Sequence, residues 1–118
     1  ESDIVKFIKI QFLSFQALAE YNNIEYHCYF PPDKKIRLFD ANKLEKILNN
    51  LISNAIKFTP KEGQIFCFAS FPKTNLLEII IQDTGEGIPE KEIKNVLYVN
   101  IKKYGENYMV KTNFFYFF

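Results

Sequence analysis

The 118-residue sequence has almost no excess charge and no long apolar run. Its 15 basic and 14 acidic residues give a formal net charge of +1, so it lacks the basic stripe that follows a phosphate backbone, and nucleic acid is not an expected partner. No apolar run approaches the roughly 20 residues that cross a bilayer, so direct membrane contact is not expected. The length suits one domain that buries a core without metal ions or disulfides.

Cysteine and histidine are also scarce. Cys28 and Cys67 each lie in a segment of alternating apolar residues, where we expect small buried hydrophobic residues and regard a disulfide as the less favoured alternative. Free thiols suit a cytoplasmic location, although a longer parent protein could be anchored in a membrane. The sequence begins at Glu1 without a signal segment, so we expect a fragment of a longer protein. The only histidine, His27, lies in a predicted strand and is interpreted as structural.

Apolar periodicity predicts helices interleaved with short strands. One helix, for which Ser2 and Asp3 are candidate caps, should run to about Asn22, and a second, capped by Asp40, from Ala41 to Phe58. Strands are predicted at 24–30, 35–39, 64–71 and 76–82. The last two are joined by a short link and should form an antiparallel pair. This pattern predicts an α+β fold, a two-layer sandwich with helices on one face of a sheet.

A further helix is predicted after the last of these strands. Pro89 suits the first position of a helix, and Glu90 and Glu92 would favour its positive N-terminal end.

The second helix carries polar residues beside its apolar face. That face is formed by Leu44, Leu48, Leu51 and Ala55, with Ile47 and Phe58 at its edge. Asn50, Asn54 and Lys57 fall within about 60° of one another along its border, which predicts a half-buried polar stripe. Asparagine is a poor residue for a helix interior, so two on one stripe need a reason.

Amide oxygens can ligate Mg²⁺ without adding negative charge beside phosphates, and Lys57 offers a compact positive charge. The stripe therefore suits a metal–nucleotide complex. In the alternative interpretation, the asparagines cap backbone groups or face solvent, and Lys57 only complements the C-terminus of the helix.

A second motif, DTGEGIP, follows the last predicted strand. Gly85 and Gly87 would let the backbone approach a ligand closely. The carboxylate of Asp83 accepts hydrogen bonds from an amine but repels a carbonyl, so it could select adenine over guanine. The alternative is a simple glycine-rich turn.

Taken together, DANKLEKILNNLISNAIKFTP and LLEIIIQDTGEGIPEKEI resemble the N-box and first glycine box of the ATP-binding domain of sensor histidine kinases. These domains form the two-component signalling branch of the Bergerat-fold (GHKL, HATPase) superfamily. The resemblance implies an ATP-binding domain over residues 1–96, with the N-box at 40–60 and the first glycine box at 83–89. Residues 97–118 would form a divergent, aromatic-rich tail, so the fold would be incomplete at its C-terminus.

The resemblance also implies a role for each site residue, with ATP and Mg²⁺ as cofactors. Asn54 would hold Mg²⁺, and Asn50 and Lys57 would contact phosphates. Phe58 would pack near the base, and Asp83 would bind the adenine amine. The remaining nucleotide-binding residues would come from the first glycine box: Thr84, Gly85, Gly87 and Ile88.

Asn50 distinguishes this sequence from other branches of the superfamily. In the topoisomerase, chaperone and mismatch-repair branches, a glutamate four residues before the metal-binding asparagine acts as general base for hydrolysis. Asn50 cannot promote attack by water in that way, so the phosphoryl group can be reserved for a histidine on another domain. The implied partners are the histidine-containing dimerisation domain and the response regulator of the parent system.

Other parts of the family pattern are missing. After Val96 the sequence has a single glycine, Gly105, and no second glycine box, and His27 does not suit a phosphoacceptor. We therefore expect weak nucleotide affinity and no kinase activity from this chain alone, with no catalytic residue assigned. The aromatic residues Phe114–Phe118 are expected to close the core or to exchange in a homodimer, so their deletion should cause aggregation or loss of folding.

Two alternatives remain open. The first is a degenerate, non-catalytic Bergerat domain that serves as a dimerisation or regulatory module. The second is a homodimeric aspartic protease, because Asp83-Thr84-Gly85 matches the catalytic triplet of that family. The polar neighbours Gln82 and Glu86 and the strongly helical first half do not suit such an all-β enzyme.

Overall fold

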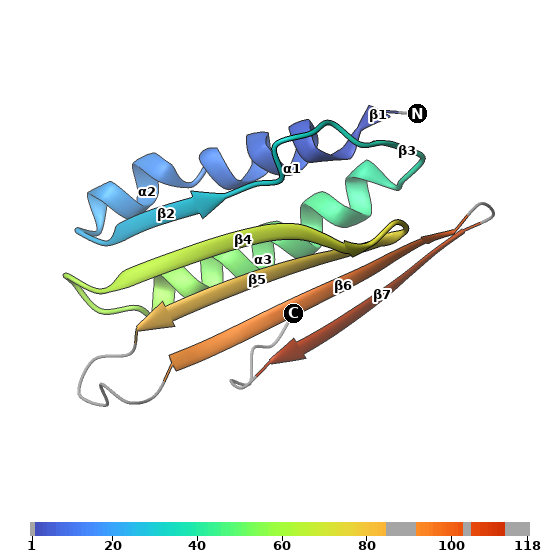
Figure 1. The fold of residues 1–118 in the computed structure, drawn as a ribbon. Helices are drawn as coiled ribbons and strands as arrows, with labels where there is room; N and C mark the ends of the chain where they lie inside the picture. Colours follow the sequence, from blue (N-terminus) through green and yellow to red (C-terminus); the bar gives the residue numbers. More distant parts are fainter. Residues whose placement is uncertain (1, 85–91, 103–104, 113–118) are drawn as a thin grey trace.

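The computed structural model describes residues 2–84, 92–102 and 105–112. Three helices lie on one side of a sheet, which confirms the predicted α+β two-layer sandwich (Figure 1). In chain order the elements are β1 (Ser2–Asp3), α1 (Ile4–Leu13), α2 (Gln16–Tyr21), β2 (Glu25–Tyr29), β3 (Ile36–Arg37), α3 (Ala41–Phe58), β4 (Gln64–Lys73), β5 (Leu76–Thr84), β6 (Glu92–Lys102) and β7 (Gly105–Thr112).

The main sheet has the strand order β2-β4-β5-β6-β7. β2 and β4 are parallel, because α3 crosses over between them, and the other neighbouring pairs are antiparallel. The predicted antiparallel pairing of strands 64–71 and 76–82, which correspond to β4 and β5, is confirmed. Only part of the predicted strand at 35–39 forms: β3 is two residues long and pairs with β1.

α3 begins and ends where the sequence predicts. The Asp40 carboxylate accepts a hydrogen bond from the backbone N–H of Lys43 at 3.0 Å, which caps the first turn. Thr59 is extended, with φ −86° and ψ 126°, as expected of a residue before proline. The predicted apolar face is buried, together with two further residues; the buried set is Leu44, Leu48, Leu51, Ile52, Ala55 and Ile56.

The first predicted helix has its Asp3 cap and ends at Asn22 as predicted, but the prediction of a single helix is wrong, since it divides into α1 and α2. The hydroxyl of Ser14 donates to the carbonyl of Gln11 at 2.7 Å, and Phe15 adopts φ −95° and ψ 0°. A hydroxyl that bonds the preceding turn competes with the helical hydrogen bonds, and the helix stops there. Asp3 caps α1 by accepting from the N–H of Val5 at 3.1 Å.

The helix predicted to start at Pro89 is also corrected by the structure. Residues 85–91 lie outside the described part, but Glu92 is the first residue of β6, which pairs with β5 in register from Leu76 to Thr84. Leu97 and Val99 are fully buried at alternate positions. Pairing with β5 and this burial therefore favour a strand over the predicted helix. The predicted domain boundary at residue 96 falls within β6 and stays a prediction.

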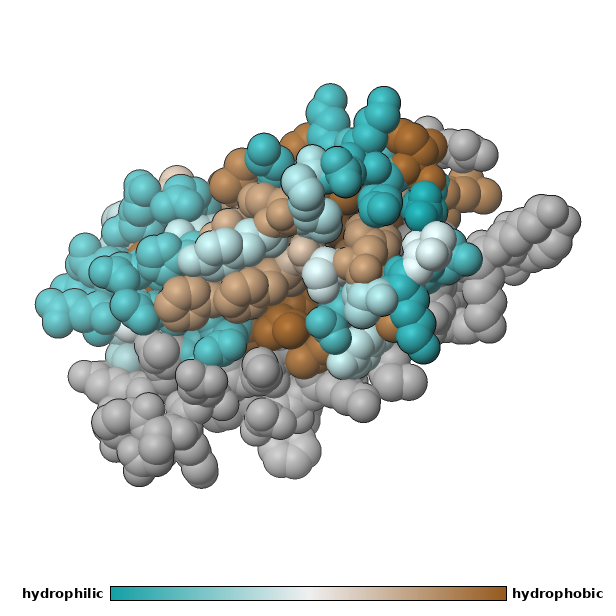
Figure 2. All heavy atoms as spheres, viewed as in Figure 1, coloured by the Kyte–Doolittle hydropathy of each residue, from teal (hydrophilic) through white to brown (hydrophobic). Residues whose placement is uncertain are grey.

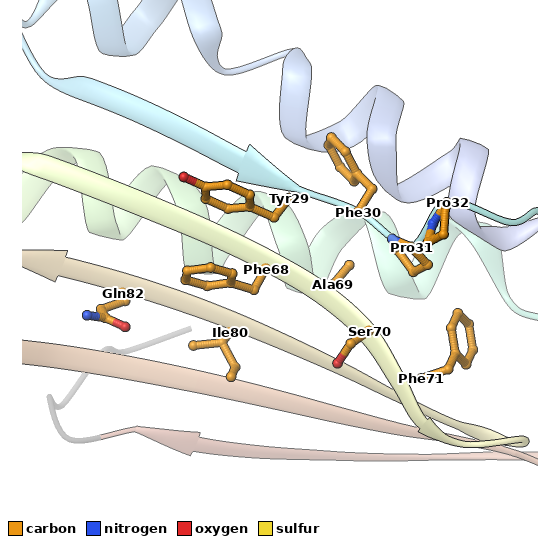
Figure 3. Close-up of a pocket in the computed structure, with 10 residues that line it drawn as sticks. All are labelled: Tyr29, Phe30, Pro31, Pro32, Phe68, Ala69, Ser70, Phe71, Ile80 and Gln82. Carbon is orange, nitrogen blue, oxygen red and sulfur yellow. The ribbon is translucent and has the colours of Figure 1, made fainter.

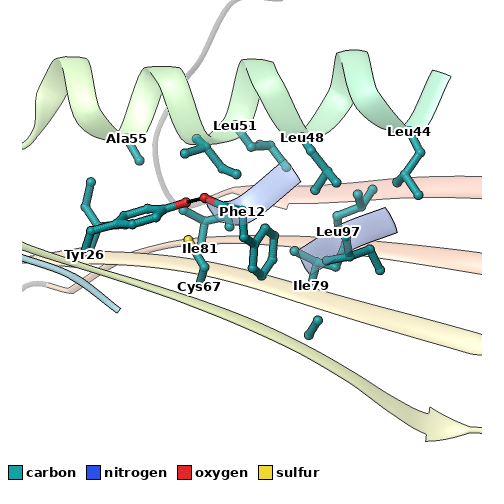
Figure 4. Packing of buried hydrophobic residues seen from close by; sticks show 14 of the residues in the cluster. Phe12, Tyr26, Leu44, Leu48, Leu51, Ala55, Cys67, Ile79, Ile81 and Leu97 are labelled. Carbon is teal, nitrogen blue, oxygen red and sulfur yellow. Dashed lines mark hydrogen bonds between the residues drawn. The ribbon is translucent and has the colours of Figure 1, made fainter. Parts of the chain in front are cut away.

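The hydrophobic core fills the space between α3 and the sheet (Figure 4). The ring of Phe12 enters it from α1, and the hydroxyl of Tyr26 donates to the carbonyl of Phe12 at 2.6 Å. Cys67 is buried and Cys28 is partly buried, and both are free thiols, as predicted. None of the helices in the described part is long and apolar enough to cross a membrane.

The opposite face of the sheet is not covered by these helices and carries aromatic rings. His27 stacks on Phe66 with ring centroids 5.1 Å apart, and Tyr29 stacks on Phe68 at 5.0 Å, so His27 is a sheet residue, as predicted. Figure 2 shows hydrophobic side chains gathered across the middle of the molecule in this view. A pocket of about 660 Å³ opens on this face beside Pro31 (Figure 3), and none of the predicted nucleotide-binding residues lines it.

Candidate functional site

The two sequence motifs meet at one end of the sandwich. α3 packs against β5, and the C-terminal ends of both elements lie at the same end of the molecule (Figure 1). The asparagine-bearing half of α3 is therefore brought to the end of the strand that carries Asp83. Chain topology thus assembles one candidate site from segments that are distant in sequence.

Asp83 is the most unusual residue of this site. It follows Ile79 and Ile81 on the face of β5 that points toward α3, and only 1% of its surface is exposed. Its Oδ2 atom is buried and has no hydrogen-bond partner among the described residues. Burial raises the pKa of Asp83 from 3.8 to about 6. A buried carboxylate without a partner is costly to the fold, so it is a candidate ligand-binding group.

The polar stripe of α3 is more exposed than predicted. Asn54 is partly buried, as expected for a residue at the border of the apolar face, whereas Asn50 and Lys57 are exposed. The half-buried stripe is therefore correct for Asn54 alone. Around the helix, Asn50 and Lys57 lie farther from the buried face than Asn54 does, so their side chains are directed into solvent.

The side-chain amides of Asn50 and Asn54 form no hydrogen bond with another residue of the described part. The hydroxyl of Ser53 donates to the backbone carbonyl of Asn50 at 3.3 Å, which leaves the side-chain amide of Asn50 unused. Of the alternative interpretation, backbone capping by these amides is therefore not supported, whereas the exposure of Asn50 and the position of Lys57 in the last turn of α3 are consistent with it. Both amides can accept a ligand without breaking an existing bond.

Two other predicted site residues, Phe58 and Thr84, end the two elements that form the site. Phe58 ends α3 with 46% of its surface exposed, and the ammonium of Lys57 lies 5.5 Å from the centroid of its ring. Thr84 is the last residue of β5. The glycine-box residues Gly85, Gly87 and Ile88 and the aromatic tail Phe114–Phe118 lie outside the described residues.

Thr59 is a candidate that sequence analysis missed, because it was assigned to the turn after α3. It is buried, and its hydroxyl oxygen has no hydrogen-bond partner within the described residues. It lines a hollow of about 640 Å³ together with Ser53, Lys57 and Lys61. The available signal was its position directly after Lys57 and Phe58, at the end of the asparagine motif.

The site offers amides for a metal ion rather than a cage of charged ligands. The described residues contain no group of three histidine, cysteine, aspartate or glutamate side chains that could hold a metal. A magnesium ion bound through one asparagine and the phosphates of a nucleotide needs no such group, since Mg²⁺ commonly keeps few protein ligands beside substrate phosphates.

The helix layer over Asp83 bears on the protease hypothesis. Asp83 lies on the face of β5 that points toward the helix layer, and three helices pack on the sheet. The all-β dimer expected for the Asp83-Thr84-Gly85 triplet does not fit this fold, so that hypothesis is not supported.

Comparison with known proteins gives concordant matches. Residues 39–113 match the family of histidine kinase-, DNA gyrase B-, and HSP90-like ATPases. The sensor histidine kinase TmoS of Ectopseudomonas mendocina is 33% identical over 95 residues, which cover 80% of this chain and 10% of that protein. The sensor histidine kinase WalK of Bacillus subtilis is 31% identical over 94 residues, 79% of this chain and 15% of that protein.

Solved structures agree on the fold. The catalytic domain of the histidine kinase ThkA superposes with a TM-score of 0.62 at 20% identity, covering 75% of this chain and 60% of that one. The chain spans only a small part of the curated relatives it matches, so their whole activities do not transfer to it directly. The chain belongs to the family of histidine kinase-, DNA gyrase B- and HSP90-like ATPases, as an ATP-binding domain of the sensor histidine kinase type.

Proposed function

We propose that this domain binds Mg-ATP at the end of the sandwich where α3 and β5 meet. In a longer, cytoplasmic parent protein, the nucleotide would supply a phosphoryl group to a histidine on a separate dimerisation domain. The observation that carries the proposal is Asp83, a buried carboxylate with one oxygen unpartnered among the described residues, in a chain of the ATPase family.

Asp83 explains why the site should prefer adenine over guanine. An ionised carboxylate in an apolar setting is stabilised by a donor hydrogen bond, and the exocyclic amine of adenine is such a donor. Guanine presents a carbonyl at the corresponding position, which would leave the carboxylate unpaired and repelled. The site should therefore discriminate between the two bases by the hydrogen-bond partner rather than by size.

The polar residues of α3 explain why the site should bind the triphosphate of a nucleotide together with a magnesium ion. The amide oxygen of Asn54 is a hard, neutral ligand, and Asn50 and Lys57 are exposed beside it to meet phosphate oxygens. Bound Mg²⁺ would neutralise part of the charge on the phosphates. The amide of Asn50 cannot take a proton from water at neutral pH, which favours transfer to a partner over hydrolysis.

The solved relatives suggest the partners. One structure of similar fold is ThkA in complex with the response regulator TrrA, which superposes with a TM-score of 0.60 at 21% identity. By analogy, a histidine-containing domain of the same parent protein would accept the phosphoryl group, and a response regulator would receive it next. This analogy rests on the fold and on the relatives, not on contacts seen in this chain.

A non-catalytic role is the second candidate, and β6 and β7 favour it. After the first glycine box these strands extend the sheet, in a part of the sequence without a second glycine box. The phosphates would then lack several backbone donors. A domain of this kind could serve its parent protein by dimerisation or regulation without transferring phosphate.

Magnesium dependence separates these two functions. Mg²⁺ should tighten binding of a fluorescent ATP analogue, and Asn54→Ala should remove most of that increase, because the substitution deletes the proposed metal ligand. The melting temperature of the free domain should stay within about 1 °C, since Asn54 is not a core residue. The matched control is Asn42→Ala, an exposed asparagine in the first turn of α3.

Two results would count against the metal assignment. If Asn54→Ala lowers the melting temperature of the free domain by several degrees, the asparagine is structural. If Mg²⁺ has no effect on binding by the unmodified chain, the non-catalytic role is the better account.

A further inference from the structure

Cys28 and Cys67 are direct neighbours across the parallel strands β2 and β4. They are register partners, and each occupies the alternate position that faces the helix layer, two residues along from the buried Tyr26 and Ile65. Neighbouring strands lie roughly 4.8 Å apart. Disulfides span Cα separations of roughly 4.4–6.8 Å. The register therefore places the two cysteines side by side, within the Cα separation that a disulfide spans.

The two thiols differ in access and in chemistry. Cys67 is fully buried in the core, whereas Cys28 is partly exposed on β2, the edge strand of the sheet. Hydrogen bonding from the Cys67 thiol lowers the pKa of Cys28, and burial raises the pKa of Cys67. Cys28 is thus the thiol that ionises first and that a small reagent can reach.

We propose that Cys28 and Cys67 form a reversible oxidation site, in which a peroxide converts the two thiols into an intramolecular disulfide that joins β2 to β4. Cys28 is the residue attacked first, and Cys67 is the resolving residue. Neither role depends on the nucleotide site.

The chemistry balances with hydrogen peroxide as the oxidant. The Cys28 thiolate attacks one peroxide oxygen, so that an S–O bond forms, the O–O bond breaks and the leaving hydroxide takes up a proton as water. The sulfur of Cys67 then attacks the sulfenic sulfur of Cys28. An S–S bond forms, the S–O bond breaks, and the leaving hydroxide combines with the Cys67 proton as a second water. The two sulfurs lose two electrons in total, and the peroxide gains them.

The structural consequence falls on the edge of the sheet. Within the described sheet, β2 pairs only with β4, so its attachment depends on one set of strand hydrogen bonds and on contacts with the helix layer. A disulfide would add a covalent link at the middle of that pairing. Oxidation should therefore make the release of β2 from the sheet harder.

The test begins with the reduced, folded chain treated with hydrogen peroxide. Under denaturing, non-reducing conditions we expect a single chain that has lost both titratable thiols and about 2 Da of mass, with recovery on addition of dithiothreitol. Peptide mapping should find Cys28 linked to Cys67. In Cys67→Ala, the oxidised Cys28 should persist as a sulfenic acid that dimedone traps, and in Cys28→Ala, Cys67 should stay reduced.

A measurement on the native chain guards against variants that fail to fold. Iodoacetamide should alkylate Cys28 at least roughly tenfold faster than Cys67, because only Cys28 is accessible and its thiol ionises more readily. Equal alkylation rates would overturn the assignment of roles. Two thiols that remain free under peroxide, or a disulfide formed only between two chains, would overturn the proposal itself.

Discussion

Asp83→Asn should weaken binding of adenine nucleotides by roughly 10- to 100-fold. The substitution keeps the size of the side chain but removes its charge, and a hydrogen bond to a charged group contributes about 1.5–3 kcal/mol. Calorimetric titration with ATP measures the change. Asp33→Asn, which removes an exposed carboxylate from the loop after β2, is the matched control and should bind as the unmodified chain does.

The same substitution should stabilise the free domain at neutral pH. Because burial raises the pKa of Asp83 to about 6, the folded state favours the protonated carboxyl. Its contribution to stability is fully present below pH about 4 and is lost as the pH rises through about 6. At pH 7 the buried charge costs on the order of 3 kcal/mol, and Asp83→Asn should recover part of it.

Urea denaturation of both proteins at pH 7 and at pH 4 checks this expectation. The stability advantage of Asp83→Asn should be largest at pH 7 and should shrink toward pH 4, since all other titrating groups are common to both proteins. A variant that is less stable than the unmodified chain at pH 7 would show that Asp83 makes a structural hydrogen bond in the free domain. Its role as a ligand-binding group would then lose its main support.

Leu48→Ala should lower the free energy of unfolding by about 2–5 kcal/mol. Leu48 is fully buried and points from α3 toward the sheet, so the substitution leaves a cavity between the two layers (Figure 4). Leu38→Ala is the control, because Leu38 is 65% exposed and its truncation should change stability by less than about 0.5 kcal/mol.

Equilibrium denaturation monitored by circular dichroism gives both values. A loss below about 1 kcal/mol for Leu48→Ala would mean that α3 does not pack on the sheet in solution. That outcome would also separate the asparagines of α3 from Asp83, since the packing of α3 on β5 is what brings the two motifs to one end of the molecule.

The sequence predicts α3 well because several local signals agree there. Asp40 caps the helix, the apolar residues recur at helical spacing, and Pro60 follows its end. The pairing of β4 with β5 is predictable for a similar reason, since both segments alternate and a short turn joins them. Where several independent local signals agree, the element that they predict is the one that the folded structure contains.

The structure of other segments depends on contacts that cannot be predicted from the local sequence pattern. Apolar spacing continues through Ser14, so only the hydrogen bond of its hydroxyl to Gln11 reveals the break between α1 and α2. In the segment from Glu92, helix-start signals compete with long-range pairing to β5, and the pairing prevails. Strand pairing between distant segments is not encoded in any short window of sequence.

In the candidate site, too, some features are predictable from the sequence and others depend on long-range contacts. The sequence predicts the position of Asp83 at the end of a strand, but not its nearly complete burial or its unpartnered oxygen, since both depend on how distant elements pack around it. The exposure of Asn50 and Lys57 follows from their positions around α3, away from its buried face. Thr59 was missed because a turn assignment gives no information about burial.

The most direct test of adenine-nucleotide binding is competition on the unmodified chain. A fluorescent ATP analogue is bound in the presence of Mg²⁺ and displaced by ATP in one titration and by GTP in another. Binding through Asp83 predicts that ATP displaces the analogue at concentrations at least roughly tenfold lower than GTP. Equal displacement by the two nucleotides, or displacement by neither, would contradict the account.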